Sequence, residues 1–293
     1  MPPRVHVTGT VPAGVHDALA ESFELVDRAD GADGILSLLT TTVDAEYLDC
    51  VGPQLRVVAN YGVGVDNVDL EATRARNVVV ANTPDVLTDD VAELTIALTL
   101  ALLRRVAEGD RLLRAEARWS FSIEFMLGET LRGKTFGVVG PGRIGRAAAA
   151  LAEGLGAKAI FASRHEGFDE LLETADVVSL HVPLTAETRH LIDAAALTLM
   201  RPTAVLVNTA RGQVVDERAL IAALRDGVIA GAALDVYEHE PEVNPELLAF
   251  DNVVLTPHIA SATRETREAM GMLAVDALRA VLLDGRVPAN SVA

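Results

Sequence analysis

The stretch TFGVVGPGRIGRAAAALA, residues 135–152, constrains the fold of this chain more than any other. Gly140, Gly142 and Gly145 have the spacing G-x-G-x-x-G, with a valine-rich run before them and a run of helical spacing after them. In that context the first glycine permits a tight turn, the second lets a phosphate approach the backbone, and the third lets the helix pack against the strand. The stretch therefore predicts a strand, a phosphate-binding loop and a helix. The alternative is a glycine-rich turn that binds nothing.

Strands and helices alternate along the rest of the chain. Expected strands lie at residues 4–9, 34–39, 56–60, 78–82, 135–140, 159–163, 177–182, 204–210, 230–236 and 252–258. Expected helices lie at residues 13–22, 67–77, 83–116, 143–156, 216–227 and 262–285. Nearly continuous apolar strands that alternate with helices indicate parallel sheets covered on both faces. We therefore expect an α/β fold with doubly wound parallel sheets.

The longest expected helices indicate where the domains divide. Residues 94–103, LTIALTLALL, are apolar on nearly all sides, so this helix is expected to be buried between domains or subunits. A chain of 293 residues also suits two domains. We expect a first domain at 1–92, a dinucleotide-binding domain at 93–264, and a return of 265–293 to the first domain.

The charge balance and the single cysteine exclude several classes of partner. Lys and Arg number 25 and Asp and Glu 42, so the formal charge of −17 repels nucleic acid and anionic membranes. Cys50 alone cannot form an internal disulfide, which agrees with a cytoplasmic location. The N-terminus lacks the pattern of a signal peptide, and ten uncharged apolar residues are too few for a bilayer that needs about 20.

The strand after the glycine-loop helix bears on the choice of cofactor. In a dinucleotide-binding fold an acid near its end binds the ribose 2′-hydroxyl of NAD, whereas an arginine accommodates the 2′-phosphate of NADP. This chain has Ser163 and Arg164 there, although Glu166 and Asp169 follow closely and would partly offset the charge. The residues favour NADP(H), with NAD(H) as the alternative cofactor and a solvated loop cation as the alternative role of Arg164. The cofactor-binding residues expected from these two stretches are Gly140, Gly142, Arg143, Ile144, Gly145, Ser163 and Arg164.

Three later strands are each followed by a charged or titratable residue, namely Arg211, Glu240 and His258. The carboxyl ends of parallel strands meet at one edge of a sheet, so we expect these side chains to converge. Arginine can hold a carboxylate, histidine can donate a proton as hydride arrives, and glutamate can orient that histidine, which together suit reduction of a 2-oxo acid. Singly, each has a structural alternative: an ion pair of Arg211 with Asp216, a turn at Glu240, or a core position for His258. No second ligand follows His258 at helical spacing, so no metal site is expected.

The stretch NYGVGVDN, residues 60–67, is a second candidate anion site. Gly62 and Gly64 permit the backbone N–H groups to surround a small anion. The alternative is a plain turn from strand to helix, capped by Asp66 or Asn67.

Seven motifs give the chain a family resemblance. It resembles the D-isomer-specific 2-hydroxyacid dehydrogenases, and among them most closely the glyoxylate/hydroxypyruvate reductases. The motifs, in order, are NYGVGVDNVDL, ANTPDVLTDDVAEL, LRGKTFGVVGPGRIG, SLHVPLTAETRHLI, VNTARGQVVDERAL, GAALDVYEHEP and TPHIASAT. The resemblance implies a Rossmann nucleotide-binding domain and a flavodoxin-like substrate-binding domain, and a homodimer formed by the helix from about Asp89. One departure is that family members usually have a longer segment where this chain has only residues 165–172.

The resemblance also implies roles for individual residues. Arg211, Glu240 and His258 would be catalytic, with His258 as the proton donor. The amides of Val63 and Gly64 would hold the substrate carboxylate together with Arg211. Further cofactor contacts would come from His181, Pro183, Thr188, Thr209, Ala210 and Asp235.

The function expected from these observations is NADPH-dependent reduction of a small 2-oxo acid to a D-2-hydroxy acid, of the glyoxylate or hydroxypyruvate type. One alternative is an NAD-linked dehydrogenase acting on phosphoglycerate, formate or phosphite. Another is a dinucleotide-sensing binding protein without turnover.

Overall fold

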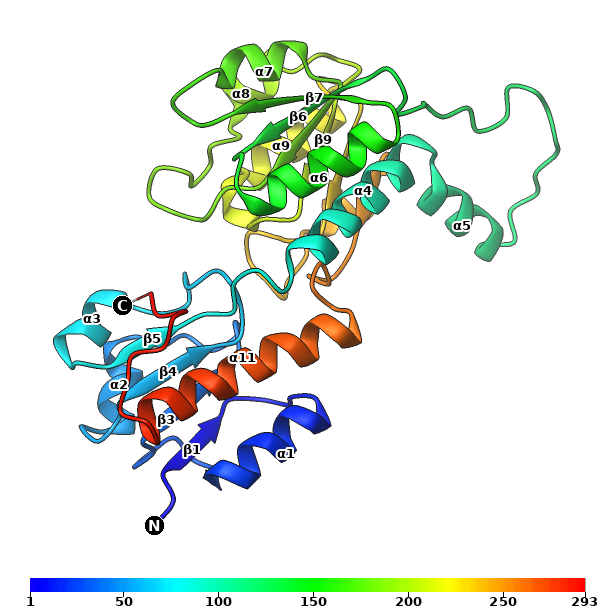
Figure 1. Cartoon of the computed structure of the whole chain (residues 1–293). Coiled ribbons are helices and arrows are strands. Elements are labelled where there is room, and N and C mark those ends of the chain that lie inside the picture. The colour runs from blue at the N-terminus through cyan, green and yellow to red at the C-terminus, as the bar shows by residue number, and fades with distance from the viewer. Residues whose placement is uncertain (293) are drawn as a thin grey trace. The chain divides into compact units, whose positions relative to one another are not determined.

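The computed structural model describes residues 1–292 and divides into two compact units (Figure 1). Unit 1 comprises Met1–Leu87 and the C-terminal segment from Ser261, and unit 2 comprises Thr88–Ala260. Both divisions fall earlier in the chain than residues 92 and 264. A division at 92 would cut a helix that begins at Thr88, and a continuous helix stays with the sheet on which it packs.

Unit 1 contains a five-stranded parallel sheet in the order β2-β1-β3-β4-β5. The strands are β1 Arg4–Val7, β2 Glu24–Val26, β3 Gly34–Ser37, β4 Val57–Asn60 and β5 Val79–Ala81. This is the order of flavodoxin-like doubly wound sheets, which confirms the expected fold class for this unit. The short edge strand β2 was not expected from the sequence.

The helices of unit 1 are α1 Ala13–Ser22, α2 Ala45–Val51, α3 Leu70–Ala75 and α11 Arg264–Leu282. Helix α11 packs against α1 and the strands β3 and β4, so the end of the chain completes the fold of its beginning (Figure 1). Asp69 caps α3, and its side chain accepts hydrogen bonds from the amides of Glu71 and Ala72. Neither Asp66 nor Asn67 is therefore the cap that the plain-turn interpretation required.

Unit 2 contains a six-stranded parallel sheet in the order β11-β10-β9-β8-β6-β7. The strands are β6 Thr135–Val139, β7 Lys158–Ala162, β8 Val177–Leu180, β9 Val205–Asn208, β10 Gly231–Leu234 and β11 Val253–Leu255. The chain leaves β6 toward β7 on one side and returns to β8 on the other. The point where strand order reverses therefore lies at β6, and open α/β sheets bind ligands beyond the carboxyl ends of such strands.

The helices of unit 2 cover both faces of this sheet (Figure 1). They are α4 Thr88–Leu103, α5 Val106–Arg114, α6 Arg143–Gly154, α7 Phe168–Thr174, α8 Ala194–Leu199, α9 Glu217–Arg225 and α10 Pro245–Leu248. Successive side chains of a strand point to opposite faces of the sheet, and each face has its own hydrophobic core. On β6, Val138 packs in the core with α4 and α6, whereas Val139 packs in the core with α7, α8 and α9.

The prediction of one long helix at residues 83–116 is wrong in one respect, because α4 ends at Leu103 and a separate helix follows. Arg105 adopts a left-handed conformation with φ 54°, and α5 begins at the next residue. The Glu129 amide donates to the Leu103 carbonyl over 2.8 Å, and this tertiary hydrogen bond satisfies a carbonyl at the end of α4. Helix α4 is covered within unit 2 by α6 and by the strands β9, β10 and β11. Among residues 1–292, no helix combines the length and the hydropathy needed to cross a membrane.

Candidate active site

The glycine loop between β6 and α6 depends on glycine at two of its three glycine positions. Gly140 has φ +96°, and a Cβ there would lie 2.7 Å from the His181 carbonyl oxygen. A Cβ at Gly145 would overlap the Gly140 carbonyl oxygen, so close packing requires both glycines. A Cβ at Gly142, in contrast, would meet no protein atom within 4 Å, and no side chain caps α6 there. The first and third glycines thus serve the fold, and the second leaves space beside a helix N-terminus that no side chain caps.

His181 follows β8, next to this loop. Its Nε2 lies 2.8 Å from the Ser179 hydroxyl oxygen. Burial lowers the pKa of His181 to about 4, so the ring is neutral near pH 7. The carbonyl of His181 packs against Gly140 of the glycine loop, and the His181 side chain lies in the protein interior.

Ser163 and Arg164 lie in the short connection between β7 and α7. The Ser163 amide donates to the Glu166 carbonyl over 3.1 Å, and the amide of His165 donates to the Ser163 hydroxyl over 3.3 Å. Nη1 of Arg164 lies 3.1 Å from Oε2 of Glu187, a residue that the sequence did not single out. Arg164 is thus an ion-paired cation beside the glycine loop, rather than a wholly solvated one.

The loop after β8 is fixed by threonine hydroxyls. The Thr188 hydroxyl donates to the Pro183 carbonyl over 2.6 Å and accepts from the Thr185 amide over 2.8 Å. Thr188 is buried, so these bonds occupy its hydroxyl and hold the loop in one shape.

The loop after β9 carries Arg211. The Asn208 side chain donates to the Arg211 carbonyl over 2.8 Å and accepts from the Ala210 amide over 3.0 Å. The Thr209 hydroxyl lies 2.9 Å from that of Thr95 on α4, which ties the same loop to the helix beneath it. The side chains of Asn208 and Thr95 thus fix the conformation of this loop by hydrogen bonds. Neither residue was a candidate from the sequence.

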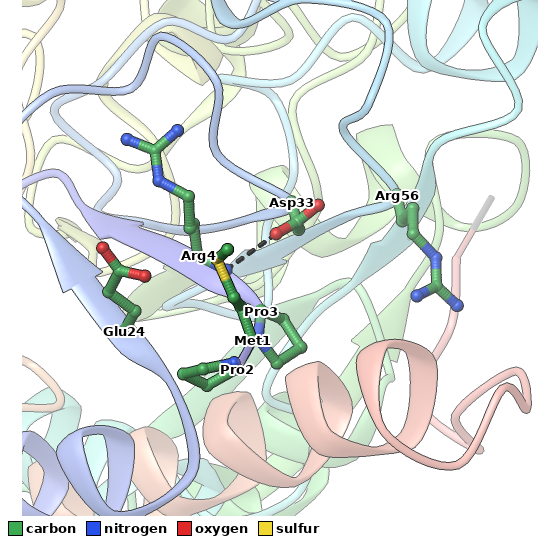
Figure 2. A pocket seen from close by; sticks show the side chains of 7 residues that line it. All are labelled: Met1, Pro2, Pro3, Arg4, Glu24, Asp33 and Arg56. Carbon is green, nitrogen blue, oxygen red and sulfur yellow. Dashed lines mark hydrogen bonds between the residues drawn. The ribbon is translucent and has the colours of Figure 1, made fainter.

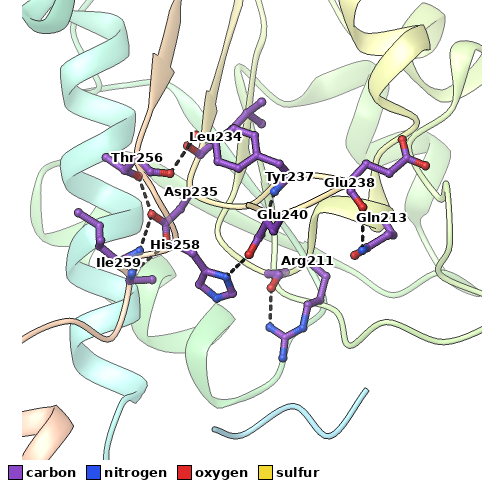
Figure 3. Close-up of polar contacts among 12 residues, drawn as sticks. Arg211, Gln213, Leu234, Asp235, Tyr237, Glu238, Glu240, Thr256, His258 and Ile259 are labelled. Carbon is purple, nitrogen blue, oxygen red and sulfur yellow. Dashed lines mark hydrogen bonds and ion pairs between the residues drawn. The ribbon is translucent and has the colours of Figure 1, made fainter. Parts of the chain in front are cut away.

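His258 and Glu240 form a direct pair. Nδ1 of His258 lies 2.7 Å from Oε2 of Glu240, whose Oε1 accepts the Tyr237 amide over 3.0 Å (Figure 3). Burial opposes the charge of Glu240, but the hydrogen bonds from His258 and Tyr237 and the charges of His258 and Arg211 outweigh it and lower its pKa. Figure 3 shows the three candidate side chains Arg211, Glu240 and His258 together, where the loops after β9, β10 and β11 meet. The convergence expected from the sequence is therefore present in the structure.

Asp235 forms hydrogen bonds with the backbone around His258. Its fully buried carboxylate accepts the Thr256 hydroxyl over 2.6 Å and the amides of Ile259 and Ala260 over 2.9 and 2.8 Å (Figure 3). Burial raises the pKa of Asp235, and these hydrogen bonds and His258 act in the opposite direction. The His258 amide donates to the Asp235 carbonyl over 2.8 Å, and His258 is left-handed with φ 53°. Asp235 therefore fixes the turn that presents the imidazole.

A second set of hydrogen bonds joins the loop of Glu240 to the loop of Arg211. Oε1 of Glu238 lies 2.7 Å from Nε2 of His190. The Glu238 carbonyl accepts from the Gln213 side chain over 3.0 Å, and its amide donates to the Glu217 carboxylate over 3.3 Å. A Cβ at Gly212 would overlap the Tyr237 carbonyl group, so only glycine permits this approach. Sequence patterns do not reveal such contacts, because they join loops far apart in the chain.

This arrangement can bind an anion and transfer a proton. With Nδ1 held by Glu240, the imidazole of His258 presents Nε2 as its remaining ionisable nitrogen. Glu240 on one side orients the imidazole, and Arg211 on the other supplies a planar set of donors for a carboxylate.

The loop after β4 in unit 1 contains Val63 and Gly64. Their carbonyl oxygens accept hydrogen bonds of 2.8 Å from the side chains of Asn82 and Asn60, respectively. Among the described residues, neither amide donates a hydrogen bond to the protein. The loop is thus fixed through its carbonyls, and its N–H groups are available to a ligand.

Unit 1 also has an open hollow of about 290 Å³ at the opposite end of its sheet (Figure 2). It is lined by Met1, Pro2, Pro3, Arg4, Glu24, Asp33 and Arg56. These residues lie at the amino ends of the strands, where open α/β sheets rarely bind ligands. Arg4 donates to the Gly31 carbonyl over 2.9 Å, and Arg56 donates to the Val281 carbonyl over 2.6 Å at the end of α11. We assign the hollow to packing around the N-terminus.

Comparison with known proteins agrees with this geometry. Residues 96–260 match the family model described as the D-isomer specific 2-hydroxyacid dehydrogenase, NAD binding domain. A glyoxylate reductase of Thermococcus litoralis is 42% identical, over 100% of this chain and 97% of that protein. The crystal structure of a protein from Thermus thermophilus superimposes with a TM-score of 0.93 at 43% identity, over 99% of this chain and 100% of that one.

A third relative is the NADPH-dependent glyoxylate/hydroxypyruvate reductase of Sinorhizobium meliloti in complex with NADP and malonate. It has a TM-score of 0.88 and 38% identity, over 100% of this chain and 97% of that chain. By sequence and by structure, this chain belongs to the D-isomer-specific 2-hydroxyacid dehydrogenase family and is an NAD(P)-dependent oxidoreductase.

Proposed function

We propose that this protein reduces small 2-oxo acids of the glyoxylate and hydroxypyruvate type to D-2-hydroxy acids, with NADPH as the preferred reductant. The observation that carries this proposal is the 2.7 Å pair of His258 and Glu240 beside Arg211. Similarity to glyoxylate reductases over the full chain supports the substrate class.

The glycine loop fits the pyrophosphate of a dinucleotide, because Gly142 has open space and α6 begins there without a side-chain cap. A bound nicotinamide dinucleotide would supply hydride to C2 of the substrate. Ser163 and Arg164 would bind the 2′-phosphate of NADPH, and the NADP bound to the Sinorhizobium relative supports this choice. The other proposed cofactor contacts are Gly140, Arg143, Ile144, Gly145, His181, Pro183, Thr188, Thr209, Ala210 and Asp235. The hydroxyls of Thr188 and Thr209 and the carboxylate of Asp235 have protein partners, so these three would contribute mainly by shaping the site.

Three side chains would carry the chemistry. Arg211 would bind the substrate carboxylate and polarise the neighbouring carbonyl. As hydride reaches C2, the protonated imidazole of His258 would donate its Nε2 proton to the carbonyl oxygen and so complete the hydroxy acid. Glu240 accepts from Nδ1, which keeps the ring oriented with Nε2 toward the site of the transfer.

For unit 1 we propose an anion-binding loop. The amides of Val63 and Gly64 would donate to a small carboxylate, and Asn60 and Asn82 would keep the loop in place. We also propose a homodimer, for which the exposed apolar residues after α5 are the evidence.

Initial rates with glyoxylate, hydroxypyruvate, pyruvate and phenylpyruvate, each with NADPH and NADH, test the proposal. We expect the highest kcat/KM with NADPH and one of the first two acids, and a D product by chiral chromatography where the product is chiral. Turnover only with NAD and phosphoglycerate, formate or phosphite would contradict it. Dinucleotide binding without any turnover would contradict it in favour of a sensing protein.

A further inference from the structure

Arg164 has an anionic partner within the protein, and this partner comes from a different loop. Nη1 of Arg164 lies 3.1 Å from Oε2 of Glu187. Arg164 follows β7, whereas Glu187 lies between β8 and α8. Because β7 and β8 are the two neighbours of β6 in the sheet, the ion pair joins the loops on either side of the strand that carries the glycine loop. A ligand that follows the glycine loop toward Arg164 therefore encounters Glu187 as well.

Glu187 is held in place by its backbone. Its amide donates to the Thr185 hydroxyl over 3.3 Å, and the next residue, Thr188, is buried and bonded to Pro183. The Glu187 side chain itself is 66% exposed and that of Arg164 is 37% exposed. The carboxylate thus projects from a fixed turn into solvent-accessible space beside the guanidinium.

The other acids near Arg164 are less closely engaged with it. Glu166 and Asp169, which the sequence suggested as the offsetting charges, form no ion pair with Arg164 among residues 1–292. The Glu166 backbone is bonded to Ser163, and its side chain is exposed. Glu187 is therefore the acid that most directly balances the charge of Arg164.

We propose that Glu187 is a specificity-determining residue for the cofactor, and that it restrains the preference for NADPH over NADH. This inference rests on the proposed function, in which Arg164 binds the 2′-phosphate. A phosphate monoester carries about −1.5 to −2 charge near pH 7, so its approach to Arg164 is opposed by the carboxylate already paired there. An NADH ribose has a 2′-hydroxyl instead, which can donate to a carboxylate. Glu187 thus supplies, from a neighbouring loop, the acid that is missing at the end of β7.

Glu187→Gln isolates the charge, because the amide side chain has nearly the same size and keeps an acceptor oxygen. We would measure dissociation constants for adenosine 2′,5′-bisphosphate and for AMP by calorimetry, which requires no turnover. Two unit charges about 4 Å apart in water change an equilibrium constant by about fivefold. We therefore expect Glu187→Gln to bind the bisphosphate about fivefold more tightly and AMP with less than about twofold change. Glu173→Gln, on the exposed side of α7 in the same unit, is the matched control and should alter neither constant.

The same measurements on Arg164→Ala separate this inference from the proposed cofactor. If wild-type protein favours the bisphosphate and Arg164→Ala loses that preference, the assignment of the 2′-phosphate site stands. In that case an unchanged or lower bisphosphate affinity in Glu187→Gln overturns the role of Glu187. If Arg164→Ala changes neither affinity, the NADP assignment itself fails, and the inference about Glu187 fails with it. In the Arg164→Ala background, Glu187→Gln should improve bisphosphate binding less than it does in the wild type, because the proposed competition is for Arg164.

Discussion

The amide of His258 donates to the carbonyl of Asp235 over 2.8 Å, while the Asp235 carboxylate accepts the two amides that follow His258. One buried residue at the end of β10 therefore fixes the turn at the end of β11. The left-handed backbone of His258 is maintained by this network, since such a conformation is unfavourable for residues other than glycine.

Asp235→Asn should weaken turnover without removing a catalytic group. An amide offers one acceptor oxygen, so its NH₂ group would face the amides of Ile259 or Ala260 and repel them. A displacement of the imidazole by about 1 Å can reduce a rate by about a hundredfold, and we expect a loss of kcat on that order with KM for the 2-oxo acid nearly unchanged. Steady-state kinetics would measure it. An equal loss after Asp226→Asn, at the exposed end of α9, would show that the effect is not specific.

Arg211 and His258 should affect different kinetic constants. His258→Gln removes the proton donor, so kcat should fall by about 10² to 10⁴ with a small change in KM. Arg211→Lys keeps a positive charge but loses the planar pair of donors, so KM for the 2-oxo acid should rise by about tenfold or more. The matched control is Arg218→Lys on the exposed side of α9, for which both constants should be unchanged. Wild-type kinetics in His258→Gln would rule out the assigned proton donor.

The pair of Glu240 and His258 should make stability depend on pH at the acidic end. The pKa of Glu240 in the folded protein is below its usual value of 4.5, so its ionised form favours the folded state. That contribution is fully present above about pH 4.5 and is lost as pH falls through the lowered pKa. We expect the denaturant midpoint of wild type to exceed that of Glu240→Gln above pH 5, and the difference to shrink as pH falls through the lowered pKa. Parallel curves at all pH values would contradict this linkage, and Glu153→Gln on α6 serves as the control.

Gly140 and Gly142 of the β6–α6 loop should respond differently to alanine. At Gly140 a Cβ would lie 2.7 Å from a carbonyl oxygen and φ is +96°, so Gly140→Ala should destabilise the fold by about 1–3 kcal/mol. Gly142→Ala has space and an ordinary backbone conformation, so its unfolding curve should match that of wild type. Its Cβ would nevertheless occupy the space proposed for the pyrophosphate, and we expect dinucleotide affinity to fall by tenfold or more, to be measured by calorimetry. Normal affinity in Gly142→Ala would place the dinucleotide elsewhere.

Much of the fold follows from the sequence because its signals are local. Valine-rich strands and the glycine spacing place β6, α6 and their neighbours, and the rule that parallel strands share a carboxyl edge brings Arg211, Glu240 and His258 together. The break at Arg105 was not predictable in the same way. Residues 104–116 favour a helix locally, and the amide that caps Leu103 belongs to Glu129, in another segment.

The partners within the candidate site were the least predictable part. Glu187 meets Arg164 because β7 and β8 flank β6, which is a property of strand order rather than of residue spacing. The family resemblance implied a cofactor contact at Asp235, but only the structure reveals the three donors that surround its carboxylate. Tertiary hydrogen bonds of this kind leave no periodic signal in a single sequence.

The segment after α5 should form a contact between two copies of the chain. Figure 1 shows α5 and this segment extending from the sheet of unit 2, and no residue of α5 is buried. Phe121 and Ile123 are 86% and 87% exposed, while Trp119 stacks on Phe125 with ring centroids 6.0 Å apart. Contiguous exposed apolar surface of this kind usually marks an interface. In a symmetric dimer, α5 and the segment after it would present the same surface on each copy.

We therefore expect wild-type protein to have the mass of a dimer by light scattering, and Ile123→Glu to dissociate more readily. A buried interface side chain commonly contributes about 2 kcal/mol, which corresponds to about a thirtyfold rise in the dissociation constant. Leu248→Glu on α10 introduces the same charge at an exposed leucine outside this segment, and it should leave the dimer intact. A wild-type monomer at every concentration, or a dimer equally stable in Ile123→Glu, would show that the segment after α5 has another role.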